Sequence, residues 1–193
     1  MNAPFTIHSG IAAPMRRDNI DTDQIIPSRE MKTVSKTGLS GGMFAGQRYL
    51  TGRTPNPNFV LNQPDYRAAT VLLGGRNFGC GSSREHAVWA LKEYGIRSVI
   101  APSFGEIFYN NMIGNGLLPI QLSNTVIDQL PTRVEVDLIA QSVCGHAFDI
   151  DPSVKQRLVG GLDAIAETLQ NHVAIDAFLA RDKVERPWVY EAK

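Results

Sequence analysis

The chain has 193 residues, the length of one domain that buries a hydrophobic core without disulfide support. Its 19 Lys and Arg residues balance 19 Asp and Glu residues, which argues against nucleic-acid binding driven by bulk positive charge. No apolar run is long enough to cross a bilayer and the first residues lack a signal peptide's basic and apolar segments, so we expect a cytoplasmic protein without a membrane partner.

The first third of the chain predicts one strand followed by irregular segments. Residues 5–15 alternate weakly between apolar and polar and predict a strand. Residues 16–27 are dense in Asp, Asn and Thr and end in Pro27, which is typical of a turn. Gly and Pro then recur through a long loop expected over about residues 32–62. A long loop in a compact domain is usually functional or mobile.

The middle of the chain alternates strands and helices, which favours an α/β fold with a parallel core. Ser103 and Glu106 have the spacing of a capping box at a helix start. Pro119 places the last strand at a sheet edge. The predicted elements are a strand at 70–73, a helix opening at Ser82 and ending before Gly95, a strand at 98–101, a helix from Ser103 to Met112 and a strand at 117–122.

The last third predicts a hairpin and two helices. Residues 134–138 and 147–150 alternate and suggest an antiparallel hairpin around Gly145. Four apolar residues at helical spacing mark an amphipathic helix, and a second, shorter helix follows at 174–179, so the C-terminal helices are expected at about 155–182. An extended tail is expected from residue 186. The four apolar positions are Leu158, Leu162, Ile165 and Leu169.

Cysteine and histidine usage bounds the cofactor chemistry of the chain. Its two cysteines lie far apart and form no CxxC pair, and its four histidines are scattered. We therefore expect no disulfide framework and no metal or iron–sulfur site built by this chain alone, so such a cofactor would come from another chain. The residues concerned are Cys80, Cys144, His8, His86, His146 and His172.

The strongest local signal is the run Gly-Cys-Gly-Ser-Ser-Arg-Glu-His at residues 79–86. A strand leads through a tight glycine turn into a helix N-terminus, whose unpaired N–H groups favour an anion. Arg84 adds a guanidinium that grips carboxylates in a fork. The alternative is a plain helix cap, in which Ser82 or Ser83 caps the helix and Glu85 completes a capping box.

Three other kinds of chemistry have weaker support at this run. Nucleotide binding is disfavoured because the glycine-rich run lacks the Lys-Ser/Thr ending of a phosphate loop. A hydrolase would pair Ser82 with His86, but no nucleophile elbow is present, and a packed His86 is favoured. Cys80 at a helix N-terminus suggests a reactive thiol, but its small size suits the tight turn, and this second interpretation is favoured.

Two further segments contribute candidate residues. Asp21-Thr22-Asp23 is typical of an Asx turn, while Asp23 is also suited to holding an arginine side chain in position. Lys36 lies in the long loop, where it is either a solvated charge or a substrate-binding cation on a loop that folds over the site.

These motifs together resemble the small subunits of 3-isopropylmalate dehydratases, which correspond to the swivelling domain of the aconitase family. The resemblance rests on residues 21–27, 77–87, 101–108 and 161–169 and covers nearly the whole chain. It implies a swivelling β/β/α domain with a mixed, mainly parallel core sheet, spanning residues 1–193 as a single domain.

The resemblance also implies an activity and a partner. The implied enzyme is a heterodimer whose large subunit carries a [4Fe–4S] cluster, and it interconverts 2-isopropylmalate and 3-isopropylmalate, a 2-hydroxy dicarboxylate pair, in leucine biosynthesis. Small subunits of homoaconitase-like or citraconate and dimethylmaleate hydratases are alternatives, as is a non-catalytic binding module with the same fold.

The site residues implied by the resemblance follow the motifs. Ser82 is the base, Ser83 lies in the site, Arg84 binds a substrate carboxylate and Asp23 supports the site. A family arginine that binds carboxylate is matched by Lys36, which offers a point charge in place of a bidentate fork. No metal ligand is implied for this chain.

Overall fold

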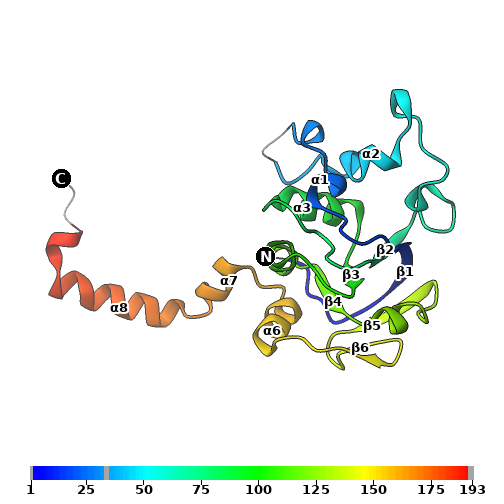
Figure 1. Cartoon of the computed structure of the whole chain (residues 1–193). Helices are drawn as coiled ribbons and strands as arrows, with labels where there is room; N and C mark the ends of the chain where they lie inside the picture. Colours follow the sequence, from blue (N-terminus) through cyan, green and yellow to red (C-terminus); the bar gives the residue numbers. More distant parts are fainter. Residues whose placement is uncertain (1, 33–34, 191–193) are drawn as a thin grey trace.

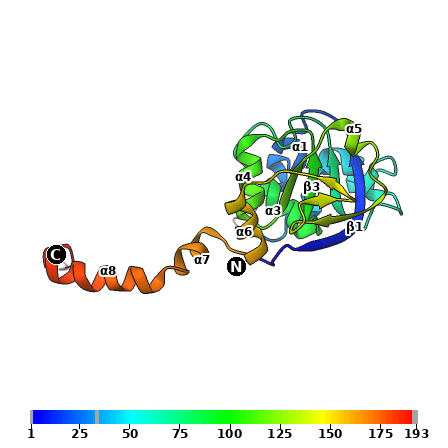
Figure 2. The ribbon, with the colours of Figure 1, turned by 90° about the horizontal axis from the view of Figure 1, so that it is seen from below.

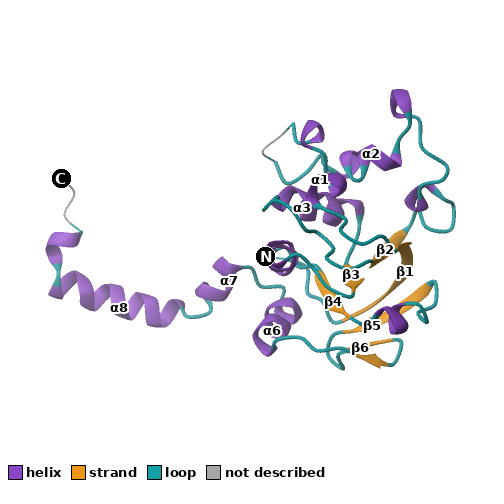
Figure 3. Ribbon diagram, in the orientation of Figure 1, coloured by secondary structure: helices purple, strands orange, loops and turns teal. Residues whose placement is uncertain are grey.

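The computed structural model describes residues 2–32 and 35–190. One seven-stranded mixed sheet runs in the order β4-β3-β2-β1-β5-β6-β7 (Figures 1 and 3). Strands β1 to β4 are parallel, and β5 to β7 continue the sheet from β1 in antiparallel pairs. The strands are β1 (Ile7–Met15), β2 (Ala69–Gly74), β3 (Ser98–Ala101), β4 (Leu118–Gln121), β5 (Arg133–Asp137), β6 (Ser142–Val143) and β7 (His146–Ala147).

The parallel half confirms the predicted α/β pattern with parallel core strands. Strands β2 and β3 are short apolar runs that are buried almost throughout, as expected for a sheet covered on both faces. Strand β4, which contains Pro119, lies at the sheet edge. Helices α3 (Glu85–Tyr94) and α4 (Glu106–Gly114) connect these strands, and Gly95 ends α3 in the left-handed conformation.

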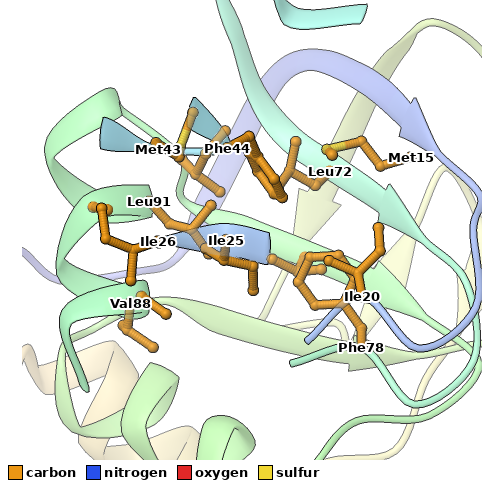
Figure 4. Packing of buried hydrophobic residues seen from close by; sticks show 14 of the residues in the cluster. Met15, Ile20, Ile25, Ile26, Met43, Phe44, Leu72, Phe78, Val88 and Leu91 are labelled. Carbon is orange, nitrogen blue, oxygen red and sulfur yellow. The ribbon is translucent and has the colours of Figure 1, made fainter. Parts of the chain in front are cut away.

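Two apolar clusters cover the two faces of the sheet. The first joins Leu72 and Val99 of the sheet to Val88 and Leu91 of α3. The second joins Ile100 and neighbouring residues to β5, to α5 (Asn124–Ile127) and to α6 (Pro152–Gly160). The first cluster also contains side chains from residues 20–61 (Figure 4). The core therefore fixes the N-terminal loops against α3.

The segment predicted as a turn and a long loop folds into short helical turns. The turn region holds α1 (Thr22–Ile25), a single helical turn capped by the Asp21 carboxylate, which accepts from Gln24 N–H at 2.7 Å. The loop is ordered because Leu39, Met43 and Phe44 are fully buried in the first cluster. Residues 33 and 34 lie outside the described residues. The loop elements are η1 (Ser28–Glu30), η2 (Ser40–Gly42), α2 (Ala45–Arg48), η3 (Thr51–Arg53) and η4 (Val60–Asn62).

Both predicted helix starts in the middle of the chain are three residues too early. Helix α3 begins at Glu85 and α4 at Glu106, and neither start carries a side-chain cap. The Ser103 hydroxyl accepts instead from the Asn77 N–H at 2.8 Å. A tertiary contact thus takes the oxygen that the local pattern assigns to a cap.

The C-terminal third differs more from prediction. The hairpin around Gly145 joins β6 to β7, while β5 pairs with β6, and no strand continues to residue 150. The predicted amphipathic helix is two helices, because Gly161 adopts φ +62 and packs against the backbone of Asn2 and Pro4. Helices α7 (Ala164–Leu169) and α8 (His172–Glu185) and the turn η5 (Pro187–Val189) extend away from the body (Figures 1 and 2).

Candidate active site

The motif at residues 79–86 begins beyond the carboxyl end of β2, where open parallel sheets commonly bind ligands. Backbone hydrogen bonds join this loop to two neighbouring loops. Gly79 N–H donates to the Ile20 carbonyl at 2.7 Å, and Thr22 N–H donates to the Cys80 carbonyl at 2.9 Å. On the other side, Gly105 N–H donates to the Phe78 carbonyl at 2.9 Å. Two neighbouring segments thus fix the loop's position.

Two glycines give the loop its shape. Gly79 has φ +75, and a Cβ there would lie 2.1 Å from the Phe108 ring. Gly81 has φ +97, which side chains rarely adopt. The chain therefore turns sharply between these residues and presents Ser82 and Ser83 to solvent ahead of α3.

Ser82 is paired with the hydroxyl of a buried threonine. Thr22 Oγ1 lies 3.2 Å from Ser82 Oγ and 3.2 Å from the Ser82 carbonyl oxygen. Thr22 itself is held by the backbone of α1 and is almost fully buried. Thr22 is a site residue that was not predicted from the sequence. The signal for it lay in its place between two aspartates, but only the fold brings it to Ser82.

Arg84 forms an ion pair with Asp23, through Nη1 and Oδ1. Ser28 Oγ also donates to Asp23 Oδ1 at 3.4 Å. The Asp23 side chain is 58% exposed and that of Arg84 24%, so the pair borders solvent. Glu85 accepts instead from Asn115 Nδ2 at 2.7 Å. The fold therefore joins Asp23, Ser82 and Arg84 in one site.

The N-terminus of α3 faces this group without a side-chain cap. Arg84 occupies the N-cap position, and Ser82 and Ser83 lie outside the helix. The interpretation of these serines as a plain cap is therefore wrong, because the Ser82 hydroxyl is held by Thr22. A ten-residue helix whose N-terminus has no side-chain cap offers N–H groups and the positive end of its dipole to an anion.

Lys36 lies elsewhere, on the outer side of α3. Its Nζ is 5.2 Å from the centroid of the Trp89 ring, a cation–π contact. Together with Thr37, Lys92 and Glu93 it lines a cavity of about 270 Å³. No hydrogen bond or ion pair recorded for the described residues links Lys36 to Asp23, Ser82 or Arg84. In this conformation the structure does not bring Lys36 into their group.

A glutamate that the sequence analysis missed anchors the loop that carries Lys36. Glu93 accepts three backbone N–H groups, from Gly38 at 2.7 Å, Leu39 at 2.6 Å and Ser40 at 2.7 Å. Partial burial alone would raise the pKa of the Glu93 carboxyl, but the hydrogen bonds from these N–H groups outweigh it and lower the pKa. The loop is therefore fastened to α3 by one carboxylate.

A second missed residue is Arg29, which lines a cavity of about 490 Å³ together with Asp23 and Ser28. Its guanidinium is mostly exposed and lies 3.6 Å from the Glu30 carboxylate. Sequence alone gave no signal for Arg29, because its place beside Asp23 depends on the turn η1. Arg29 is therefore a second cation, besides Arg84, near Asp23.

The structure argues against the two nucleophile alternatives. Burial is the main cause, and the nearby Asp21 carboxylate the second, of the raised pKa of the Cys80 thiol, so less of the reactive thiolate forms. The His86 ring packs on Trp89, with centroids 4.6 Å apart, as expected for a packed histidine. The Ser82 hydroxyl is paired with Thr22 and not with an imidazole.

The described residues do not fit an iron–sulfur cluster. Cys80 and Cys144 are both free thiols on separate elements. Within residues 2–32 and 35–190, no group of three His, Cys, Asp or Glu side chains has the arrangement of a metal site. In the same part of the chain, no helix combines the length and apolar character required to span a membrane.

Comparisons with known proteins agree with this geometry. The aconitase C-terminal domain family matches residues 2–125. The 3-isopropylmalate dehydratase small subunit of Cupriavidus necator is 52% identical, over 97% of this chain and 98% of that protein. The protein of the same name from Afipia carboxidovorans is 48% identical, over 96% and 98%.

A solved structure gives the same relationship. The 3-isopropylmalate dehydratase LeuD of Methanocaldococcus jannaschii superposes with a TM-score of 0.68 at 29% identity, covering 89% of this chain and 98% of that one. The fold, the glycine turn with its serine and arginine, and relatives of about half-identical sequence agree. The chain belongs to the family of 3-isopropylmalate dehydratase small subunits, within the aconitase C-terminal domain family.

Proposed function

We propose that this chain is the small subunit of a 3-isopropylmalate dehydratase and interconverts 2-isopropylmalate and 3-isopropylmalate in leucine biosynthesis. The names of its relatives favour this substrate over those of homoaconitase-like or citraconate hydratases. The observation that carries the proposal is the group formed by Ser82, Thr22, Arg84 and Asp23 at the uncapped N-terminus of α3. A merely structural cap would need neither the ion pair nor the open helix end.

Ser82 acts as the base in this proposal. Dehydration removes a proton from the carbon next to the hydroxyl-bearing carbon, and the Ser82 oxygen accepts it. A serine oxygen is a weak base unless positive potential stabilises its alkoxide. The dipole of α3, the Arg84 guanidinium and the hydroxyl of Thr22, 3.2 Å away, supply that potential. In the hydration direction the Ser82 hydroxyl returns the proton.

Arg84 binds a carboxylate of the substrate. Asp23 fixes one Nη of the guanidinium, which leaves other donors to form a fork with the substrate. Ser83 and the first N–H groups of α3 border the same space and suit a second anionic oxygen. We assign Lys36 to the substrate as a further cation, which requires its side chain to leave the Trp89 ring while Glu93 keeps the loop at α3.

The remaining chemistry belongs to a partner chain. Because the described residues do not fit a metal cluster, we assign the [4Fe–4S] cluster of this family, a Lewis acid for the departing hydroxyl, to the large subunit. This chain supplies the base and the carboxylate contact. The complex is proposed to be a heterodimer in the cytoplasm.

The test is turnover by Ser82→Ala in complex with its cognate large subunit. We expect kcat for 2-isopropylmalate to fall by roughly 10²–10⁴, the usual contribution of a general base. Ser9→Ala, a serine on β1 away from the site, is the matched control and should retain wild-type turnover.

Binding of the variant to the large subunit, measured separately, shows that the complex still forms. Near-normal kcat in a Ser82→Ala complex would overturn the role of Ser82. Wild-type turnover of homoaconitate or citraconate in preference to isopropylmalate would overturn the substrate assignment, and no turnover of any 2-hydroxy diacid would favour a binding module.

A further inference from the structure

The last part of the chain leaves the body of the molecule. Residues 163–190, here called the C-terminal arm, comprise α7, α8 and η5 and extend outward from Gly161 (Figures 1 and 2). The arm begins where Asn2 N–H donates to the Gly161 carbonyl at 2.9 Å, near the amino end of β1. The site lies beyond the carboxyl ends of β1 and β2, so the arm departs from the opposite edge of the sheet.

The arm carries most of the large apolar side chains that the described residues expose. Nine of thirteen such residues lie on it, with exposed fractions of 38% to 81%. With about 200 Å² for a large aromatic and about 100 Å² for an aliphatic side chain, they present roughly 700 Å². One partner of a standard interface buries about 800 Å². The nine are Ile165, Leu169, Val173, Phe178, Leu179, Val184, Trp188, Val189 and Tyr190.

The apolar residues of α8 point in several directions. At 3.6 residues per turn, Val173 and Val184 share one side, while Phe178 and Leu179 lie about 140° and 240° around the axis. Charged residues such as Asp176, Arg181 and Lys183 lie between them, so α8 has no single apolar stripe. A partner that covers these apolar side chains must therefore contact the arm on more than one side.

At the end of the arm, side-chain hydrogen bonds hold the turn η5 against α8. Asp182, only 5% exposed, accepts from Arg186 Nε at 2.6 Å and from the Tyr190 hydroxyl at 2.6 Å. These bonds fold η5 back against α8 and leave the Trp188 side chain 68% exposed. A fixed, exposed tryptophan is the type of residue that dominates binding energy at interfaces.

We propose that the C-terminal arm docks into an apolar groove of the large subunit and that Trp188 anchors it there. This inference rests on the proposed function. The matches to two relatives named small subunits cover 97% and 96% of this chain, so they include most of the arm. Since the arm leaves near the amino end of β1 and the site lies beyond the carboxyl ends of β1 and β2, the contact with the arm does not occupy the space around Ser82.

A second copy of this chain is the less suitable occupant. Only four large exposed apolar residues lie outside the arm among the described residues, against nine on it, so the body of a second copy offers the arm much less apolar surface. The four are Ile7, Leu50, Ile107 and Ile139. Pairing of two arms with each other is the outcome that the experiment must distinguish.

The experiment measures the affinity of the full chain for its purified large subunit. The arm variant combines Val173→Gln, Phe178→Gln, Val184→Gln and Trp188→Gln, because glutamine preserves helix propensity while removing apolar surface. The control variant combines Ile7→Gln and Ile139→Gln, which remove exposed apolar residues from the body. Trp188→Gln alone tests the anchor with α8 intact.

We expect Kd to rise at least a hundredfold in the arm variant and about tenfold in Trp188→Gln, and to change less than threefold in the control. At saturating large subunit, kcat of the arm variant should equal that of the wild type. Unchanged Kd overturns the proposal, as does a loss of self-association without a change in Kd. Because Kd is measured by binding, a wild-type complex that forms but lacks turnover refutes the proposed function and not the docking of the arm.

Discussion

At the scale of single residues, the site depends on two pairs with different tasks. Asp23 lowers the net charge beside Arg84, yet it fixes a guanidinium that would otherwise sample many rotamers. Thr22 is buried and rigid, and it holds the exposed Ser82 hydroxyl at 3.2 Å. Ser82 and Arg84 thus each have a partner that sets the position of the side chain, which suits groups that must meet substrate in one geometry.

The fork geometry of Arg84 gives the first prediction. Arg84→Lys keeps the charge but loses the paired donors, so kcat/KM for 2-isopropylmalate should fall by roughly a hundredfold or more, equivalent to about 2.7 kcal/mol. Arg76→Lys is the matched control. Arg76 lies on the same loop as Arg84, is mostly exposed and pairs with Asp18. A surface pair of that kind is worth about 0–1 kcal/mol.

Steady-state kinetics of both variants in the complex provides the measurement, and thermal melting monitors the fold. The melting temperature of each should change little. Catalytic efficiency of Arg84→Lys within a few-fold of wild type would assign Arg84 to the scaffold.

At the scale of elements, the sequence predicts what depends on buried apolar runs and misses what depends on distant partners. Strands β2 and β3 are identified because they are apolar throughout. The start of α3 is misplaced because the Ser82 hydroxyl binds Thr22, sixty residues away. Likewise, Ser103 binds Asn77 and not its own helix. Ser82, Arg84 and Asp23 were predicted from their motifs, whereas Thr22 and the pairing of these residues required the fold.

The long loop shows the same limit. Its burial against α3 through Leu39, Met43 and Phe44 could not be inferred from its glycines and prolines. Nor could the Glu93 contact, because an exposed glutamate in a helix is ordinarily a solvated charge. The loop that carries Lys36 is therefore positioned by one carboxylate and three N–H groups.

Glu93→Gln gives a prediction at this scale. The amide oxygen still accepts hydrogen bonds but without charge, so the loop should loosen and KM should rise several-fold with kcat nearly unchanged. The folded-state pKa of Glu93 is lowered, so its stabilising contribution is complete above the ordinary glutamate pKa and is lost as pH falls through the lowered value. The stability advantage of the wild type over Glu93→Gln should therefore be largest near neutral pH and should shrink as the pH falls through that range.

Kinetics of the complex and pH-dependent melting of the isolated chain test this prediction. Glu93→Asp, which keeps the charge, should recover part of the wild-type KM. Glu106→Gln, on α4, is the control for loss of one carboxylate. Equal KM and equal acid unfolding in wild type and Glu93→Gln would show that the contact does not position the loop.

At the scale of the whole molecule, the candidate site and the C-terminal arm lie at opposite ends of the parallel strands. The proposed base Ser82 and the proposed carboxylate ligand Arg84 lie beyond the carboxyl ends of these strands, while the arm leaves near the amino end of β1. Among the residues that the structure describes, none covers the exposed Ser82 and Ser83. Exclusion of water from a substrate bound there is the task that we assign to the large subunit.

The isolated chain is therefore expected to be colourless and inactive. Its described residues do not fit a metal cluster, and Ser82 and Arg84 alone provide no group for the departing hydroxyl. Titrating the chain into a fixed amount of cluster-loaded large subunit should raise turnover to a plateau at one small chain per large chain. The Ser82→Ala chain should compete with wild type and lower that plateau, because it occupies the same place without supplying the base. Absorbance, iron and sulfide content and turnover are measured together; stoichiometric iron and sulfide with turnover in the chain alone would refute the division of the site between two subunits.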